Sequence, residues 1–346
     1  MKNLFLKLKR GNISGTLYLV FCIVFLGPLC CKSGSIVDAK TGRPKGAQGD
    51  ASSGYYFDDI ARYLGGFEIP ADSKLKPFTE NPDYALHREK MAAFWNKVRT
   101  QNINPVKEWR DTVLYKSDGA PVCRSDRAAF YPLSGADIIN LYTMCPYASE
   151  YIMVALEKAG DIPHPEKNSP RYYQGLRNMR SVINNIADRN YFFSAHMKTN
   201  IVKNTEIPGI APVLLAFTSG IGWRIVTMEK IYLSPSGGVI VAPEPNSGNS
   251  TPSGTPGGVR IWFRTDTDSR LRSLTYIEQY LDSAAVSPDY PLTKFLAQKR
   301  GAFMMLKAAV YLMHNNFYNS VRDFFITIPD VIVQDDSGFK YTYLRD

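Results

Sequence analysis

Histidine and cysteine are scarce in this chain, which has four of the first and five of the second among 346 residues. No CxxC pair and no cluster of cysteine with histidine occurs, which excludes the common structural zinc sites. The stretch "YPLSGAD", residues 131–137, has neither the glycine spacing of a phosphate-binding loop nor the G-x-S-x-G of a nucleophile elbow. We therefore expect neither a metal ion nor a cofactor.

Acidic residues are missing from the start of the chain, where Asp38 is the first. The formal charge of +9 includes four cations within the first ten positions, Lys2, Lys7, Lys9 and Arg10. The remaining lysines and arginines are spread out, without a basic stripe or an aromatic-basic motif. We therefore expect no nucleic-acid partner.

Residues 17–26, "LYLVFCIVFL", form an unbroken apolar run between this basic start and the breaker Gly27-Pro28. A basic segment, a short apolar core and a breaker are typical of a secretory signal peptide. A signal anchor is the rival interpretation, but a spanning helix needs about twenty apolar residues and this run has about half of that.

Two adjacent thiols, Cys30 and Cys31, follow the apolar run. A cysteine in this place is typical of bacterial lipoproteins, in which acyl chains on the new N-terminal cysteine hold the protein on a membrane. The alternative is ordinary cleavage after Ser35, with Ser33 and Ser35 as the small residues. We favour lipidation, because it explains the paired cysteines. It predicts an exported protein anchored in the bacterial envelope, facing the periplasm or the surface.

Only Cys123 and Cys145 remain in the body of the chain. In an exported protein they can form a disulfide, closing a loop of about 22 residues and contributing roughly 3 kcal/mol. The alternative is a pair of buried free thiols.

Composition divides the chain into three parts. Residues 1–31 are the signal peptide and lipidation region, and residues 32–54 are rich in Gly, Ser and Ala, as in a flexible linker. Residues 55–346 carry the large apolar and aromatic side chains, so we expect one folded domain there.

Residues 128–160 indicate the fold class. Ala128–Tyr131 predict a strand, and Ser134 with Asp137 three positions later matches a capping box that opens a helix to about Met144. Residues 151–157 are nearly all apolar, as in a strand buried on both faces. A strand, a helix and a buried strand make a βαβ unit, so we expect an α/β domain with a single mixed sheet and helices packed on it.

The rest of the chain adds further elements. Helices are expected at 83–100, from Pro170 onward, at 207–220, at 303–314 and at 317–328. Strands are expected at 223–233, 259–265, 273–281, 331–334 and 339–344, with an edge strand within the long loop at 234–258.

Three stretches together resemble a family of uncharacterised bacterial envelope proteins, many of which carry lipoprotein signals. The stretches are "FYPLSGADIINLYTMCPYASEYIMVALEKAG", "YFFSAHMKTNIVKNTEIPGIAPVLLAF" and "LKAAVYLMHNNFYNSVRDFFITIPDVIVQDDSGFKY", which cover most of residues 128–346. The resemblance implies secretion and one α/β domain, and it implies no reaction. Members usually have a hydroxyl residue where His196 stands and continue past the "QDDSG" strand, whereas this sequence stops at Asp346.

Two adjacent carboxylates, Asp335 and Asp336, precede Ser337 and Gly338 between two expected strands. This order is typical of a type I turn in a β-hairpin, which needs only one of the two carboxylates. The other is free to bind a ligand. Asp137, at the strand-to-helix turn where ligands bind in α/β sheets, is the third binding candidate.

Few residues in this sequence are candidates for a catalytic role. Ser134, His314, Asp335 and Asp336 supply the residue types of a hydrolase, and Ser134–His314–Asp335 would match a catalytic relay. Two functions follow. The first is an exported, lipid-anchored envelope protein that binds an envelope component or a partner protein. The alternative is an exported hydrolase with a carboxylate and histidine site.

Overall fold

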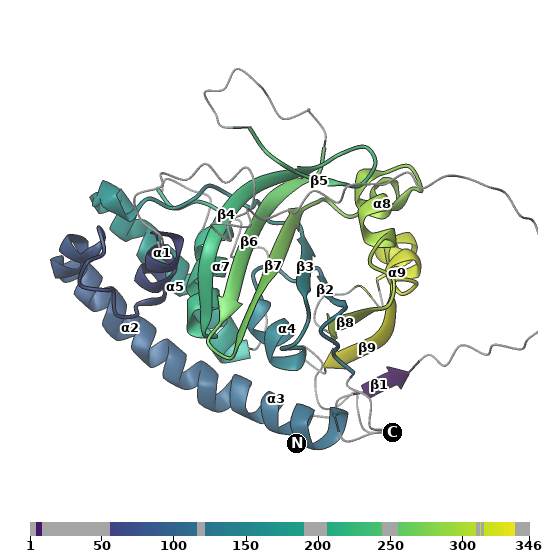
Figure 1. The fold of residues 1–346 in the computed structure, drawn as a ribbon, viewed down its shortest axis with the longest axis horizontal. Coiled ribbons are helices and arrows are strands. Elements are labelled where there is room, and N and C mark those ends of the chain that lie inside the picture. Colours follow the sequence, from purple (N-terminus) through teal and green to yellow (C-terminus); the bar gives the residue numbers. More distant parts are fainter. Residues whose placement is uncertain are drawn as a thin grey trace, which may run out of the picture.

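One mixed β-sheet runs through the domain, and helices pack against both of its faces (Figure 1). This confirms the predicted α/β class with a single mixed sheet. The computed structural model describes residues 5–8, 56–115, 122–189, 206–243, 255–308, 312 and 315–335.

The strands follow the order β1-β9-β8-β2-β3-β7-β6-β4-β5 across the sheet. The five strands from β9 to β7 in this order are parallel neighbours, and β6, β4 and β5 continue the sheet in antiparallel fashion. Strand β1 pairs with β9 in antiparallel fashion at the other edge. The strands are β1 (Phe5–Leu8), β2 (Ala128–Pro132), β3 (Glu150–Ala155), β4 (Trp223–Leu233), β5 (Val239–Val241), β6 (Gly257–Thr265), β7 (Asp268–Glu278), β8 (Ala302–Lys307) and β9 (Pro329–Asp335).

The helices divide between the two faces. The first face carries α1 (Tyr56–Gly65), α2 (Pro82–Val98), α4 (Ile138–Met144), α5 (Pro170–Arg189) and α7 (Ala211–Gly220). The second face carries α8 (Pro291–Ala297) and α9 (Asn319–Phe325). The α/β/α layering follows from strands that are apolar on both sides: in β3, Tyr151 and Met153 join the first core, and Ile152 and Val154 join the second.

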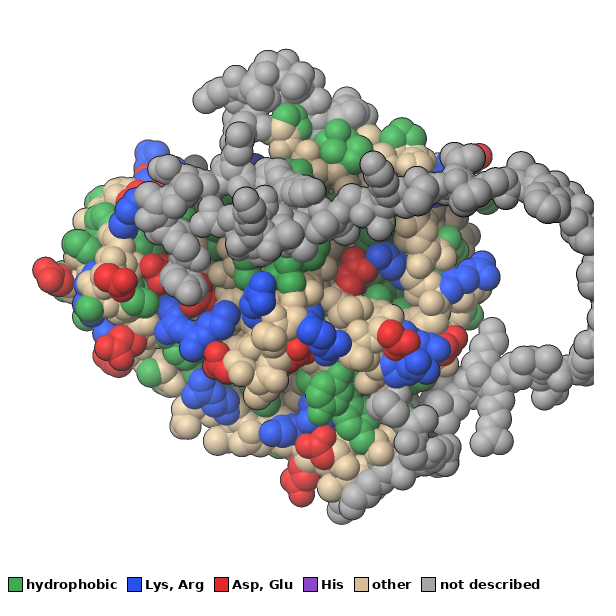
Figure 2. All heavy atoms as spheres, viewed as in Figure 1, with side chains coloured by type: hydrophobic (Ala, Val, Ile, Leu, Met, Phe, Trp, Pro, Cys, Tyr) green, Lys and Arg blue, Asp and Glu red, His purple; other side chains and the backbone are tan. Residues whose placement is uncertain are grey.

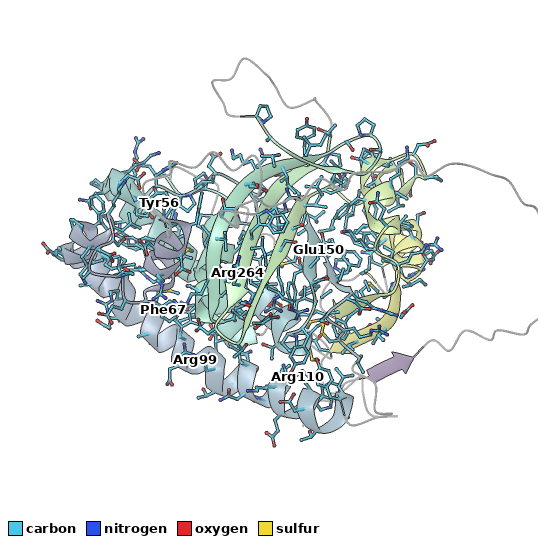
Figure 3. The ribbon with its side chains drawn as sticks, in the orientation of Figure 1. Tyr56, Phe67, Arg99, Arg110, Glu150 and Arg264 are labelled. Atoms are coloured by element: carbon cyan, nitrogen blue, oxygen red, sulfur yellow. A yellow bond between two sulfur atoms is a disulfide. The ribbon has the colours of Figure 1, made fainter. Side chains whose placement is uncertain are left out.

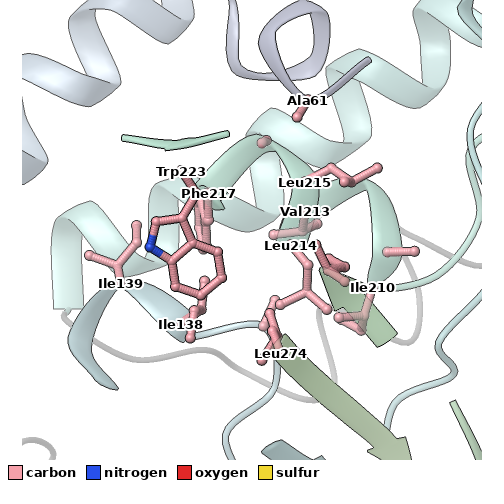
Figure 4. Packing of buried hydrophobic residues seen from close by; sticks show 14 of the residues in the cluster. Ala61, Ile138, Ile139, Ile210, Val213, Leu214, Leu215, Phe217, Trp223 and Leu274 are labelled. Atoms are coloured by element: carbon pink, nitrogen blue, oxygen red, sulfur yellow. The ribbon is translucent and has the colours of Figure 1, made fainter. Parts of the chain in front are cut away.

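The first core is built around α7, whose buried side chains contact several elements at once. Figure 4 shows Phe217 of α7 and Trp223 of β4 near Ile138 and Ile139 of α4, with Leu274 of β7 below them. All five side chains are at most 2% exposed. Burial of this apolar surface fixes the helical layer on the sheet, at about 25 cal/mol for each Å² removed from water.

The predicted βαβ unit is present. Strands β2 and β3 are parallel neighbours, and α4 connects them on the first face. The expected strands at 223–233, 259–265 and 273–281 are also present as β4, β6 and β7, with β6 and β7 antiparallel.

The helix expected at 303–314 is wrong at its start, where Ala302–Lys307 form strand β8 between β2 and β9. A continuous apolar run is compatible with either a buried helix or a strand buried on both faces, and periodicity does not distinguish them. Pairing with β2 on one side and β9 on the other satisfies the backbone of β8. The helix expected next is present as α9.

A long helical rod extends from α2 along the lower edge of the view in Figure 1. It continues through a π-helical segment (Arg99–Ile103), α3 (Asn104–Trp109) and a second π-helical segment (Arg110–Leu114). Arg110, labelled near the end of the rod in Figure 3, donates to the Thr143 carbonyl oxygen at 2.5 Å. This bond ties the rod to α4.

A contact between two glycines joins the end of β3 to the start of α7. Gly160 and Gly209 both have positive φ angles, of 80° and 84°. A Cβ on Gly160 would lie 2.1 Å from the Pro208 carbonyl oxygen, so only glycine fits. The bonds from Ile210 N to Lys158 O and from Ala211 N to Ala159 O, at 3.0 and 2.9 Å, complete the junction.

Cys123 and Cys145 form a disulfide, so the alternative of two free thiols does not apply. The bond links the segment before β2 to the C-terminal end of α4, across 22 positions. The cross-link therefore encloses β2 and α4.

Candidate functional site

Strands β2 and β8 are neighbours in the sheet, but the chain leaves them in opposite directions. After β2 the chain forms α4 on the first face and returns as β3, whereas after β8 it forms α9 on the second face and returns as β9. The boundary between β2 and β8 is therefore a topological switch point. In open α/β sheets, ligands bind at the carboxyl ends of the strands at such a point.

A buried ion pair lies at this switch point. Lys307, the last residue of β8, places its Nζ 3.0 Å from Oδ2 of Asp137, which follows β2, and both side chains are 1% exposed. Asp137 also accepts hydrogen bonds from the Asn140 amide groups and from the Tyr131 hydroxyl, at 2.8–3.2 Å. Both oxygens of the Asp137 carboxylate therefore have donors.

Asp335 joins the same group from β9. Its Oδ2 lies 3.9 Å from Lys307 Nζ, and its Oδ1 accepts from the Ala308 amide at 3.3 Å. With 11% of its side chain exposed, Asp335 is the most accessible member of the trio Asp137, Lys307 and Asp335. We call these three residues the switch-point cluster. It brings together two of the binding residues expected from the sequence, Asp137 and Asp335.

Burial governs the protonation of this cluster. Loss of water raises the pKa of Asp137, and the charge of Lys307 and the hydrogen bonds from Asn140 act against that rise. Burial also raises the pKa of Tyr131 well above 10, so its hydroxyl stays protonated and donates to Asp137. The ion pair with Lys307 and the hydrogen bonds from Asn140 and Tyr131 hold the Asp137 side chain in place.

The turn between β2 and α4 differs from the capping box expected at Ser134. Helix α4 begins at Ile138, and its N-cap is Asp137, whose Oδ1 accepts from the Asn140 N–H at 3.2 Å. The Ser134 hydroxyl instead donates to the carbonyl oxygen of Gly135, at 3.2 Å. Leu133 has a φ of 52°, a left-handed conformation that costs a non-glycine residue about 1–2 kcal/mol. Strain of this kind is frequent at functional sites.

The remaining expected site residues lie outside the described part of the chain. These are His314 and Asp336, together with the turn to Gly338 and the strand at 339–344, and the proposed lipidation residues Cys30 and Cys31.

The sequence predicts surface positions for His87, which stands among charged residues of α2, and for His164, which lies between two prolines. His87 is instead fully buried. Its Nε2–H donates to the Leu64 carbonyl oxygen at 2.9 Å, and its Nδ1 accepts from Arg180 Nη1 at 2.8 Å. The bond accepted at Nδ1 requires the neutral ring, and burial beside the Arg180 charge lowers the pKa of His87 to about 3. By contrast, His164 is half-exposed and contacts Glu166 at 2.9 Å, in agreement with a surface position.

Sequence reasoning missed Lys307, the centre of the site. A lone lysine inside an apolar run was the available signal, since a charge is almost never buried without a partner. It went unused because the run was assigned to a helix, where Lys307 would not meet the end of β2.

Within the described residues, no group of three or more His, Cys, Asp or Glu side chains is arranged to hold a metal ion. None of the helices described here combines the length and the apolar character that crossing a membrane requires. Comparisons of this chain with protein-family models, with curated proteins and with solved structures found no match.

Proposed function

We propose that this chain is an exported protein, anchored in the bacterial envelope by a lipid on Cys30 or Cys31, whose α/β domain binds an envelope component or a partner protein. Cleavage before the lipidated cysteine removes the edge strand β1 with the signal peptide, so the described sheet of the mature protein runs from β9 to β5. We place the binding surface at the switch point between β2 and β8. The observation that carries the proposal is the switch-point cluster, a buried lysine between two carboxylates at the carboxyl ends of parallel strands.

A cluster of this kind lowers the stability of the fold, so its presence is better explained by a role in binding than by a role in stability. Removing an ammonium and two carboxylates from water is unfavourable, and apolar residues of the same volume are often equally stable or better. Here the cost is combined with a strained residue in the adjoining turn, Leu133. Both features fall at the position where α/β folds bind ligands. Asp335, the partly exposed member, is the group we expect to contact the ligand.

The hydrolase alternative has less support. A general base needs a lone pair that can receive a proton, and the Asp137 carboxylate already accepts from Asn140, Tyr131 and Lys307. Ser134 directs its hydroxyl to a carbonyl oxygen, and the described histidines, His87 and His164, bond elsewhere.

The surface carries charges of both signs, so it is compatible with a partner of either charge. On the face shown in Figure 2, lysine and arginine side chains are interspersed with aspartate and glutamate. Several charges of the described residues form pairs, such as Arg127 with Asp330 and Arg124 with Asp126. This pattern gives no preference for a polyanion, in keeping with an envelope component or a protein as the proposed partner.

Binding at the switch point is tested with the full chain carrying Cys30→Ser and Cys31→Ser, so that no lipid anchor contributes. This protein is sedimented with purified peptidoglycan sacculi, with vesicles of phosphatidylethanolamine and phosphatidylglycerol, and with washed envelope fragments. We expect saturable binding to one of them, weakened about tenfold by Asp335→Asn, since a hydrogen bond to a charged group is worth about 1.5–3 kcal/mol. Asp330→Asn, on the same strand and 57% exposed at its side chain, is the matched control. Equal binding by the two variants, or no binding to any of the three probes, would contradict the proposal.

The lipid anchor is tested separately, by growth with a fatty-acid analogue that can be labelled after lysis. We expect the native chain to incorporate the label and to sediment with membranes, and the Cys30→Ser, Cys31→Ser double variant to do neither. Single variants identify which thiol carries the lipid. If the double variant still incorporates the label and stays in the membrane pellet, the anchor is not at these cysteines.

A further inference from the structure

The edge of the sheet at β9 is occupied by β1, a segment of the expected signal peptide (Figure 1). The two strands are antiparallel, and Leu6 and Leu8 lie opposite Val333 and Val331. In the exported protein of the proposed function, on which this inference rests, β1 leaves with the signal peptide. Strand β9 then loses the neighbour that it has in the full chain.

Strand β9 is apolar on both faces, as expected of a strand with a neighbour on each side. On one face, Val333 is 1% exposed and belongs to the first core, and Val331 packs against that core. On the other face, Ile332 packs against the second core. Removing β1 exposes backbone N–H and C=O groups along this strand, which promote pairing with another chain. We therefore expect another segment to take the place of β1.

The residues that directly follow β9 can reach this edge. Strand β9 ends at Asp335, and the sequence continues through residues 336–338 to "FKYTYL", residues 339–344. A hairpin places its second strand antiparallel to the first, which is the direction in which β1 pairs with β9. The other side of β9 is taken by β8. A hairpin strand therefore has only the edge that β1 occupies.

The turn fixes the register of such a hairpin. Asp335–Gly338 have the residue types of a type I turn, and a glycine in the last place is typical of the three-residue loop that ends in a left-handed residue. With residues 336–338 as this loop, Tyr341 lies opposite Val333. The next residue, Thr342, then lies opposite Ile332.

This register matches the pairing of β1. Tyr341 stands in the place of Leu6, and Thr342 stands in the place of Lys7. In each segment an apolar or aromatic residue lies opposite the buried valine of β9, and a polar residue follows it. The two ends of the chain thus carry segments with the same alternation for the same edge.

We propose that residues 339–344 pair with β9 in the mature protein, in the place that β1 holds in the full chain. A loop of about three residues joins them to β9, so that little loop-closure entropy opposes the pairing once β1 is gone. Strand β9 then has a neighbour on each side before and after removal of the signal peptide. This protects its edge from pairing with another chain.

The test compares one preparation of the full chain before and after removal of β1. The chain carries Cys22→Ser, Cys30→Ser and Cys31→Ser, so that these thiols do not interfere. A specific protease site within residues 32–54 allows the first segment to be cut off and separated. Engineered disulfides then report which segment lies beside β9.

Ile332→Cys is combined in turn with three partners. With Lys7→Cys, a disulfide should form in the uncut chain. With Thr342→Cys, it should form about tenfold faster or more after cutting than before. Tyr341→Cys lies one position earlier, on the opposite face of the expected strand, and as the matched control should form no disulfide in either state. Thermal unfolding of each variant verifies the fold.

Hydrogen exchange tests the pairing without cysteines at the edge. The amides of residues 339–344 should exchange about tenfold more slowly or less after cutting than before. Gly338→Val should abolish this protection, because a β-branched residue is strained in the left-handed conformation that the loop needs. Ser337→Val, at a position that needs no left-handed residue, is the control and should keep the protection.

The proposal is wrong if cutting changes neither the rate of disulfide formation with Thr342→Cys nor the exchange of residues 339–344, or if the removed segment stays bound to the domain. Because the cut is made in the purified protein, this result does not depend on export. The mass of the chain isolated from cells tests removal of the signal peptide separately.

Discussion

Replacing Lys307 by Met should lower the free energy of unfolding by about 3–5 kcal/mol. The methionine fills a similar volume but removes the ammonium that lies 3.0 Å from Asp137 and 3.9 Å from Asp335. The substitution leaves a carboxylate that is 1% exposed without its cation, which is the costly way to break a buried ion pair. Urea denaturation followed by circular dichroism measures the loss from the midpoint and slope.

Two further variants separate charge from packing. Adding Asp137→Asn to Lys307→Met removes the unpaired charge, so the double variant should recover part of the stability, giving a clear coupling energy in a double-mutant cycle. Lys299→Met breaks a pair with Glu150 that is more than a fifth exposed at both side chains, and should cost at most about 1 kcal/mol. If the Lys307→Met protein is as stable as the Lys299→Met protein, Lys307 and Asp137 do not form a buried ion pair.

His87 should make the domain unstable in acid, with a loss of about 3 kcal/mol between pH 7 and pH 4.5. The folded pKa of about 3 lies below the ordinary 6.5, so the unfolded chain binds the extra proton between these values. Stability from this group is therefore present in full above about pH 6.5 and is lost as the pH falls toward 3. Each unit of pH in this window costs about 1.4 kcal/mol.

The pH dependence is measured by urea denaturation at half-unit intervals from pH 4 to pH 7.5. Burial raises the pKa values of Asp58 and Asp59, so these carboxyl groups also contribute to the pH dependence of stability. The difference between the parent chain and His87→Gln isolates the imidazole, because those carboxyl groups are present in both. His164→Gln, at a half-exposed position, is the matched control and should keep the parental slope. A His87→Gln protein with the parental slope would mean that folding does not change the pKa of His87, against the value of about 3.

Local sequence patterns predicted the elements whose structure depends on local interactions. The strand at 128–131, the alternation at 259–265 and the helix that begins at Pro170 are all present, because periodicity reports which side of an element is buried. The start of the helix expected at 303–314 was wrong, because an apolar run satisfies a buried helix and a central strand equally. That choice is made by pairing with β2, which lies far away in the sequence.

The candidate site was only half predictable for the same reason. Asp137 and Asp335 were identified from turns, which are local features. Their common partner, Lys307, becomes visible only once β8 takes its place between β2 and β9. His87 was misplaced because neighbouring charges on α2 suggested a solvent-facing side, whereas Leu64 and Arg180 enclose the ring.

The position of β8 has a consequence for the time at which the sheet forms. Ala129 pairs with Phe303, about 170 residues later, so the middle of the sheet stays incomplete until almost all of the chain has been synthesised. Closing such a long loop slows folding, and contacts between distant segments form late. A chain that crosses a membrane through a narrow channel has to remain unfolded until it has passed. In a protein exported as proposed here, the late arrival of its central strand would delay folding until most of the chain has been made.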